Sequence, residues 1–327
     1  GIGITQDINE VADQALIDTL ANGVYESTEL NGAMTFFPVV VQPTAMLYRV
    51  DRFEELGLEI PETWEEFYEV CEALTRDTDG DGVTDEWAFS MVGENGSSGQ
   101  GRYLSYLWSN GYDVVYEEDG VWKTDITADD TEFLEVFSLW TDLNEDGLVP
   151  VGITEVDYST AANYFAMGYT SLFMTGSNAL GVAYTSNPDL EGLVGSFTLP
   201  GSAAGTQLGT EGYGMSAYAT DAEKEAAMAF LEYFLTNDED MNFWNASGKI
   251  PATTEGQEVD YIQESDYAGY IQQIEDGCLD TCTFEGLSGL KSVLGDAYSA
   301  VFSGEKDNQA AIEELVSDID ELLADYN

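Results

Sequence analysis

Residues 77–86 form a stretch whose acidic side chains have the types and spacing of a calcium site. The stretch reads Asp-Thr-Asp-Gly-Asp-Gly-Val-Thr-Asp-Glu, and its Asp-x-Asp-x-Asp-Gly order matches the start of a calcium-binding loop. Carboxylates at the first, third and fifth positions can converge on one hard cation because Gly82 permits a sharp turn. The candidate ligands are Asp77, Asp79, Asp81, the carbonyl oxygen of Val83, Asp85 and Glu86.

The end of this stretch departs from the calcium pattern. Its twelfth position is Ala88, where such loops have a bidentate Glu, so either Glu86 substitutes or the site is weaker and more hydrated. The alternative interpretation is a solvated acidic turn, since acidic residues are abundant in the whole chain. We expect a structural Ca²⁺ here rather than a catalytic one.

The chain lacks the residues that several common enzyme mechanisms require. It contains no His, which excludes His-based triads and His metal sites. The glycine patterns of nucleotide-binding loops are also absent. A glycosidase that uses two carboxylates stays an open alternative. In a chain with 63 acidic residues, however, a pair of neighbouring carboxylates is no evidence for such an enzyme.

The three cysteines suggest structure rather than reactivity. Cys71 lies on an apolar helix stripe and is typical of a small core residue. Cys278 and Cys282 are separated by three residues, and with no His and no further cysteine a zinc site is disfavoured. A local disulfide between them fits better and suits an extracellular location.

The acidic balance is extreme for a folded chain. Of 327 residues, 63 are acidic and 9 basic, which gives a net charge of -54. The chain is nevertheless rich in aromatic residues, unlike a disordered acidic segment. Self-repulsion at this charge is largely screened at molar salt, where the Debye length is about 3 Å. We therefore expect a protein of a halophilic archaeon, and nucleic acid or anionic membranes are disfavoured as partners.

The elements that position these residues alternate between strands and helices. Residues 36–43 are an apolar run of strand length, and residues 133–143 repeat apolar side chains at helical spacing. Residues 312–323 carry one apolar stripe opposite acidic side chains. This alternation predicts an α/β architecture, and no segment is apolar and long enough to span a membrane.

Residues 48–66 carry the strongest pattern of the chain. They read as the end of a strand, a short helix that ends at Gly57, a turn with Pro61, and a second helix. Thr63 and Glu66 have the spacing of a capping box at the start of that second helix.

The order of Tyr48, Asp51, Phe53, Gly57-Leu58, Pro61 and Thr63-Trp64 closely resembles a segment of the extracellular solute-binding proteins of ABC importers. This large family is mostly sugar-binding and includes maltose-binding-protein-like members. Further resemblances lie at residues 165–176, 195–201 and 210–217, so that the resemblance covers most of the chain.

The resemblance implies a two-lobed, type II periplasmic-binding-protein-like α/β fold with hinge crossings. It assigns residues 1–43 and 213–263 to an N-lobe, and residues 44–212 and 264–327 to a C-lobe. In the family, strand-helix-strand units come before the region that matches residues 5–32, so we expect an incomplete N-lobe, without its first strands.

The resemblance also implies a ligand site in the cleft between the lobes. It assigns Gln42 to the first crossing, Glu211 and Tyr213 to the second, and Gln100, Arg102 and Tyr103 to a cleft loop; further candidates are Tyr158, Asn178 and Lys291. Alternative roles stay open: the two tyrosines 158 and 213 as core or rim residues, and the two basic side chains as partners of nearby acids.

The function implied is the substrate-binding component of an ABC transporter, which captures a sugar or oligosaccharide and delivers it to the membrane permease. Its expected location is the cell surface, with a lipid anchor on the missing N-terminus. Two alternatives are a secreted glycan-active hydrolase and a calcium-stabilised surface protein.

Overall fold

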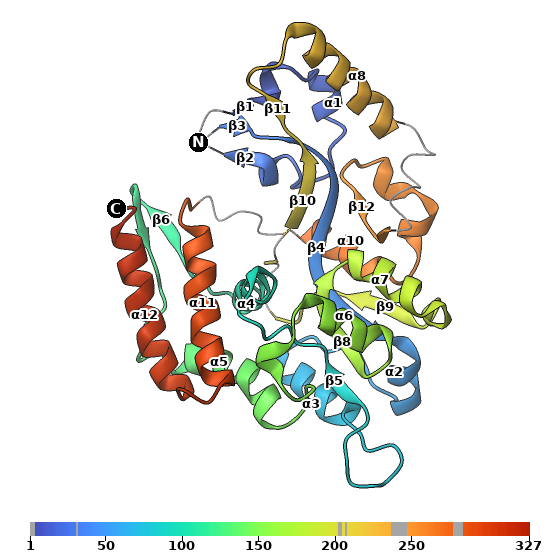
Figure 1. Cartoon of the computed structure of the whole chain (residues 1–327), viewed down its shortest axis with the longest axis vertical. Coiled ribbons are helices and arrows are strands. Elements are labelled where there is room, and N and C mark those ends of the chain that lie inside the picture. The colour runs from blue at the N-terminus through green and yellow to red at the C-terminus, as the bar shows by residue number, and fades with distance from the viewer. Residues whose placement is uncertain (1–3, 31, 202–204, 207, 237–246, 277–283) are drawn as a thin grey trace.

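The computed structural model describes residues 4–30, 32–201, 205–206, 208–236, 247–276 and 284–327. Two lobes are joined along one long strand, β4 (Phe37–Arg49), which runs through the middle of the molecule (Figure 1). Within the described part, no helix combines the length and apolar character that crossing a membrane requires.

Strand β4 exchanges its partners halfway along its length. Residues 37–43 pair antiparallel with β10 (Leu208–Tyr213), and Val40 and Val41 also pair with β12 (Ile250–Pro251). From Thr44 onward, β4 pairs instead with β8 (Thr170–Gly176) and β9 (Val194–Phe197). Pro43 stands at the change of partners, where a residue without a backbone N–H is least costly to a ladder.

The other connections between the lobes lie after β9 and after β12. The whole of β10 pairs with the N-lobe half of β4, so the expectation that placed residues 208–212 in the C-lobe is corrected. The chain then returns after β12, and α10 (Ala268–Asp276) packs against β4 and β9 in the C-lobe.

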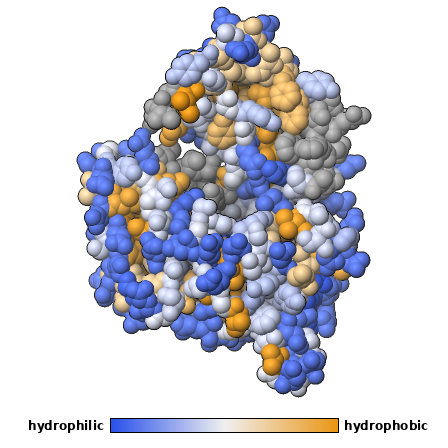
Figure 2. Space-filling view, viewed as in Figure 1, coloured by the Kyte–Doolittle hydropathy of each residue, from blue (hydrophilic) through white to orange (hydrophobic). Residues whose placement is uncertain are grey.

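The N-lobe is small in the described part of the chain. Its remaining elements are β1 (Thr5–Gln6), α1 (Gln14–Ile17), β2 (Glu29–Leu30), β3 (Ala33–Met34), β11 (Met215–Ser216) and α8 (Asp221–Thr236). A separate core forms under α8, where Leu231 and Leu235 pack with Phe37 and Val40 of β4. Hydrophobic residues also gather on the face of this lobe that Figure 2 shows. Phe230 of α8 is 50% exposed.

The C-lobe places helices around its sheet. Its strand β5 (Trp87–Phe89) runs parallel to β8, and β6 (Tyr116–Glu118) with β7 (Val121–Lys123) forms a separate hairpin. Its helices are α2 (Val50–Leu56), α3 (Trp64–Leu74), α4 (Ser97–Ser109), α5 (Thr131–Glu145), α6 (Tyr158–Ala166), α7 (Asn178–Ser186), α10, α11 (Leu287–Phe302) and α12 (Asn308–Ala324).

Local signals in the sequence set the ends of these helices. The side chain of Thr63 accepts a hydrogen bond from the backbone of Glu66, whose carboxylate accepts from the backbone of Thr63, so the capping box begins α3. Gly57 ends α2 in the left-handed conformation, with φ of 66°. The aromatic ring of Trp64 then packs edge-on against Tyr106 and Trp140 inside the lobe.

Candidate ligand-binding groove

A groove of about 310 Å³ lies where β4 passes from one lobe to the other. Both sides of the crossing contribute to it: Gly209 comes from the N-lobe strand β10, and the first turns of α4, α6 and α7 come from the C-lobe. The described residues that line it are Gln42, Thr44, Ser97, Ser98, Gly101, Arg102, Tyr158, Gly176, Asn178 and Gly209. All of them are polar residues or glycines, so the groove offers hydrogen-bond donors and acceptors to a ligand.

Two glycines keep the floor of the groove open beside Gln42. A Cβ on Gly176 would lie 3.0 Å from Asn178 Oδ1, and a Cβ on Gly209 would lie 3.2 Å from the carbonyl oxygen of Gln42. The amide nitrogen of Gln42 donates to Glu211 Oε1 at 2.6 Å, and Lys249 binds the other carboxylate oxygen at 2.5 Å. The charge of Glu211 is therefore compensated beside the groove.

Asn178 and Tyr158 form the C-lobe wall. They are the first residues of α7 and α6, and the Asn178 side-chain amide donates to the Tyr158 hydroxyl at 2.9 Å. Burial raises the pKa of Tyr158, so its phenol stays protonated at neutral pH. A neutral phenol next to an amide offers both donors and acceptors to a hydroxylated ligand.

The guanidinium of Arg102 ties this wall to α4 and β8. Its Nε donates to the carbonyl oxygen of Met174 at 2.7 Å, and its other nitrogens donate to Ser98 and Thr175. The guanidinium carbon also lies 5.4 Å from the centre of the Tyr158 ring, within the range of a cation–π contact. Burial lowers the pKa of Arg102 to about 10, which leaves it charged at neutral pH.

Five predicted site residues are not among those that line the groove: Glu211, which lies beside it and contacts Gln42, and four others. Tyr103 is only 1% exposed and donates to the carbonyl oxygen of Val92, because its face of α4 turns into the core. Gln100 faces α11, where a Cβ on Gly295 would lie 2.7 Å from its Cγ. Lys291 lies half-buried on α11 and is not among the lining residues.

Tyr213 is the fourth of these, and it lies at the end of β10 that is remote from Gly209. The pairing of β10 with β4 changes register after Glu211: Glu211 lies opposite Val40, and Gly212 lies opposite Pro38. Tyr213 then pairs with Phe37 at the far end of β10 and contacts Phe230 of α8, with ring centres 6.1 Å apart. Tyr213 is therefore not among the residues that line this groove.

Several groove residues escaped the sequence analysis. Thr44, Ser97, Ser98, Gly101, Gly176 and Gly209 line it, and Lys249 holds Glu211. Small residues at helix starts and strand ends were the available signal, but such residues are common and only the crossing brings these together.

The acidic stretch brings three of its six predicted ligands together. Carboxylate oxygens of Asp77, Asp79 and Asp85 lie within 4.8 Å of one another. Asp81 instead accepts a hydrogen bond from the backbone of Val83, which is itself 64% exposed.

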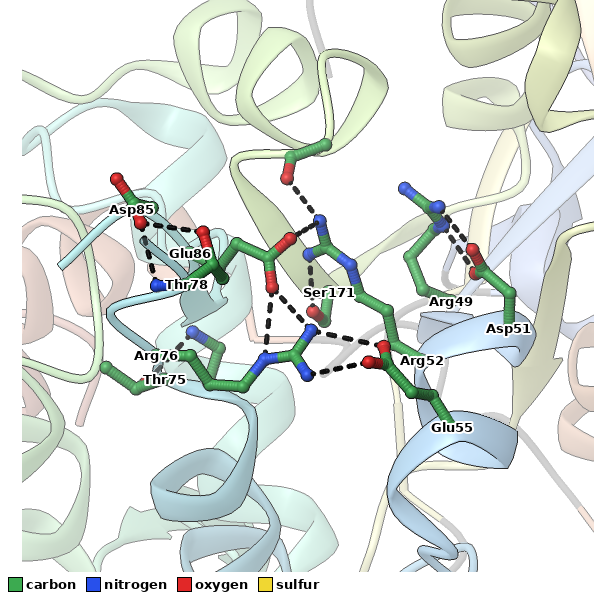
Figure 3. Close-up of polar contacts among 12 residues, drawn as sticks. Arg49, Asp51, Arg52, Glu55, Thr75, Arg76, Thr78, Asp85, Glu86 and Ser171 are labelled. Carbon is green, nitrogen blue, oxygen red and sulfur yellow. Dashed lines mark hydrogen bonds and ion pairs between the residues drawn. The ribbon is translucent and has the colours of Figure 1, made fainter. Parts of the chain in front are cut away.

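Glu86 is turned away from this cluster and is not part of it. Its Oε1 binds Arg52 at 2.7 Å and its Oε2 binds Arg76 at 2.6 Å (Figure 3). Asp85 points the other way and accepts from Thr78. Consecutive side chains of an extended segment point to opposite sides, which explains why the two acids separate.

The cysteine predictions divide between described and undescribed parts. Cys71 is fully buried and free, as its helix stripe indicated. Cys278 and Cys282 lie outside the described residues, so their disulfide stays a prediction.

Comparison with known proteins gives a consistent result. The family model for bacterial extracellular solute-binding proteins matches residues 1–241. A protein of Brucella abortus described as a binding protein is 21% identical over 98% of this chain and 80% of its own length. The multiple sugar-binding protein of Streptococcus mutans is 23% identical over 74% of this chain and 57% of its own.

A solved structure shares the fold. The maltose-bound MalE3 of T. maritima superimposes with a TM-score of 0.81 at 20% identity, covering 98% of this chain and 80% of that one. The predicted α/β, two-lobed fold is thereby confirmed. The family match confirms the prediction of a solute-binding protein. The chain belongs to the family of bacterial extracellular solute-binding proteins.

Proposed function

We propose that this protein is the substrate-binding component of an ABC importer, which captures a sugar or a related polyol in the groove and delivers it to the membrane permease. The observation that carries the proposal is the position of the groove at the change of partners of β4. A ligand held there contacts elements of both lobes, so lobe closure by a hinge motion would enclose it.

The chemistry of the lining supports a hydroxylated ligand. Gln42, Asn178 and Tyr158 present amide and phenol groups at the crossing, and such groups fix the orientation of sugar hydroxyls. The similarity to the maltose-bound structure and to a multiple sugar-binding protein agrees with this class. Attachment to the cell surface through a lipid anchor stays a prediction.

Titration calorimetry of sugars and polyols in molar KCl tests the proposal. We expect one solute class to bind saturably, and Asn178→Ala to weaken that binding about tenfold or more through the loss of one or two hydrogen bonds. Tyr213→Ala is the matched control, since Tyr213 lies outside the groove, and it should bind as the parent does. Turnover of a glycoside would instead support the hydrolase, and binding of no solute would favour the surface protein.

We also propose that residues 77–85 hold a structural Ca²⁺, supported by the convergence of Asp77, Asp79 and Asp85. Calcium at about 100 times its dissociation constant should stabilise the folded state by about 2.7 kcal/mol. Thermal unfolding with and without calcium measures this. Asp79→Asn should remove most of the calcium-dependent shift and the control Asp81→Asn little of it; no shift in the parent protein would contradict the proposal.

A further inference from the structure

The groove differs from the rest of the protein in its charge. About one residue in five of the chain is acidic, yet none of the ten described residues that line the groove is Asp or Glu. The one charged side chain among them is Arg102. A second hollow, between α1 and α8, shows the usual pattern of this chain, with Asp13, Asp221, Glu225 and Glu232 in its lining.

Arg102 also lacks a carboxylate partner in the described part of the chain. Its hydrogen bonds go to Met174, Ser98 and Thr175, which are all neutral. The ion pairs of the described residues involve other basic side chains: Arg49, Arg52, Arg76, Lys123, Lys249 and Lys306. Arg102 is half-buried, and a partly desolvated cation without a counter-ion is costly, so an anion that enters the groove would offset this cost.

A second polar group beside the groove also has no partner. The hydroxyl of Ser177 is fully buried and makes no hydrogen bond, although its neighbours Gly176 and Asn178 both line the groove. Ser177 is the N-cap residue of α7, and its side chain makes no capping hydrogen bond. By contrast, Asp157 caps the start of α6 with its carboxylate. The positive end of the α7 dipole is therefore left without an acidic group.

We propose that the natural ligand of the groove is a small hydroxylated anion, either a sugar acid or a phosphorylated sugar or polyol, whose negative charge is compensated by Arg102. This inference rests on the proposed function and narrows its substrate class. Gln42 and Asn178 would bind hydroxyl groups, while Arg102 and the start of α7 would favour the acidic group. Because four hydrogen bonds already fix the guanidinium, it acts mainly through its charge and through the N–H bond of its Nη2 that Thr175 does not use.

Matched pairs of solutes test the charge preference directly. Titration calorimetry in molar KCl at equal ionic strength compares glucuronate with glucose, and glycerol 3-phosphate with glycerol. We expect the charged member of at least one pair to bind about tenfold or more tightly than its neutral counterpart. The pair that shows the preference distinguishes a carboxylate from a phosphate ligand.

Substitutions then test whether the groove is responsible. Ser97→Asp adds a carboxylate to the lining at the first residue of α4, where an acidic side chain is compatible with the helix. It should reduce the preference for the charged solute about tenfold, whereas the isosteric neutral control Ser97→Asn should preserve it. Arg102→Gln should abolish the preference, and Arg102→Lys should retain part of it because the charge remains.

The other outcomes would contradict the anion inference, the proposed function or both. Equal binding within both pairs, or tight binding of neutral sugars alone, would overturn the anion inference and leave the proposed function standing. Binding of neither charged nor neutral solutes would overturn both. A charge preference that survives both Ser97→Asp and Arg102→Gln would show that Arg102 is not its source and would overturn the inference as stated.

Discussion

Two arginines of the C-lobe, the buried Arg52 and the half-buried Arg102, have opposite electrostatic surroundings. Arg52 on α2 is 8% exposed and binds Glu86, Ser171 and the carbonyl oxygen of Gly168 (Figure 3). Arg102 on α4 binds only neutral groups beside the groove. Burial lowers the pKa of both, but Glu86 opposes the shift for Arg52, while only tyrosines oppose it for Arg102.

The difference separates a structural role from a binding role. Arg52 of α2 and Arg76, which precedes the acidic stretch, share Glu86 at the end of that stretch, so this network joins α2 to the stretch. The charge of Arg102 is left uncompensated at a surface that a ligand can reach. Since the chain has 63 acidic residues, the absence of carboxylates from the described lining supports a groove that binds an anion.

The largest expected effect is on stability, from the substitution Arg52→Met. It breaks a buried ion pair and should lower the free energy of unfolding by about 3 kcal/mol, near the low end for such losses because Arg76 still binds Glu86. Denaturant unfolding in molar KCl measures the change. Ligand selectivity should not change, because Arg52 does not line the groove.

The substitution Arg102→Met sharpens the comparison. It should lower the free energy of unfolding by about 2 kcal/mol or less, because it removes hydrogen bonds but leaves no carboxylate without its partner. Glu55→Gln, which alters an exposed partner of Arg76, serves as the control and should leave the stability within about 0.5 kcal/mol of the parent. If Arg102→Met proved more destabilising than Arg52→Met, the distinction between the two arginines would fail.

The smallest effect concerns a partly exposed pair, Arg49 with Asp51. Burial alone would raise the pKa of Asp51, but the hydrogen bond and charge of Arg49 outweigh it and hold the pKa below the ordinary value of 3.8. The ionised carboxylate therefore stabilises the fold above pH 3.8, and this contribution is lost as the pH falls through its lowered pKa. Asp51→Asn should cost less than about 1 kcal/mol at neutral pH, because exposure and salt screen the pair.

Comparing the unfolding of Asp51→Asn and the parent at neutral and acidic pH checks this sign. The difference in stability should shrink as the pH falls. A difference that stays constant would mean that Asp51 acts through packing rather than through its charge.

Much of the fold and part of the groove could be predicted from the sequence. The pattern from Tyr48 to Glu66 indicated the family. Local signals such as the Thr63 capping box and Gly57 predicted helix ends, because they act through hydrogen bonds to nearby backbone groups. Of the groove, Gln42, Tyr158, Asn178 and Arg102 were identified through the resemblance. The lining residues Thr44, Ser97 and Gly209 were not, because nothing local marks a residue that becomes functional only when distant segments meet.

The sequence by itself determined the α/β class, the acidic composition and the helix boundaries, because these follow from residue content, periodicity and short-range hydrogen bonds. Only the tertiary structure decided which neighbouring residues share a site. Pairing with Phe37 places Tyr213 at the far end of β10, next to α8, and the alternation of side chains sends Glu86 to two arginines while Asp85 stays with the acidic cluster. Strand register and side-chain direction depend on pairing partners far away in the chain, and a local pattern does not contain them.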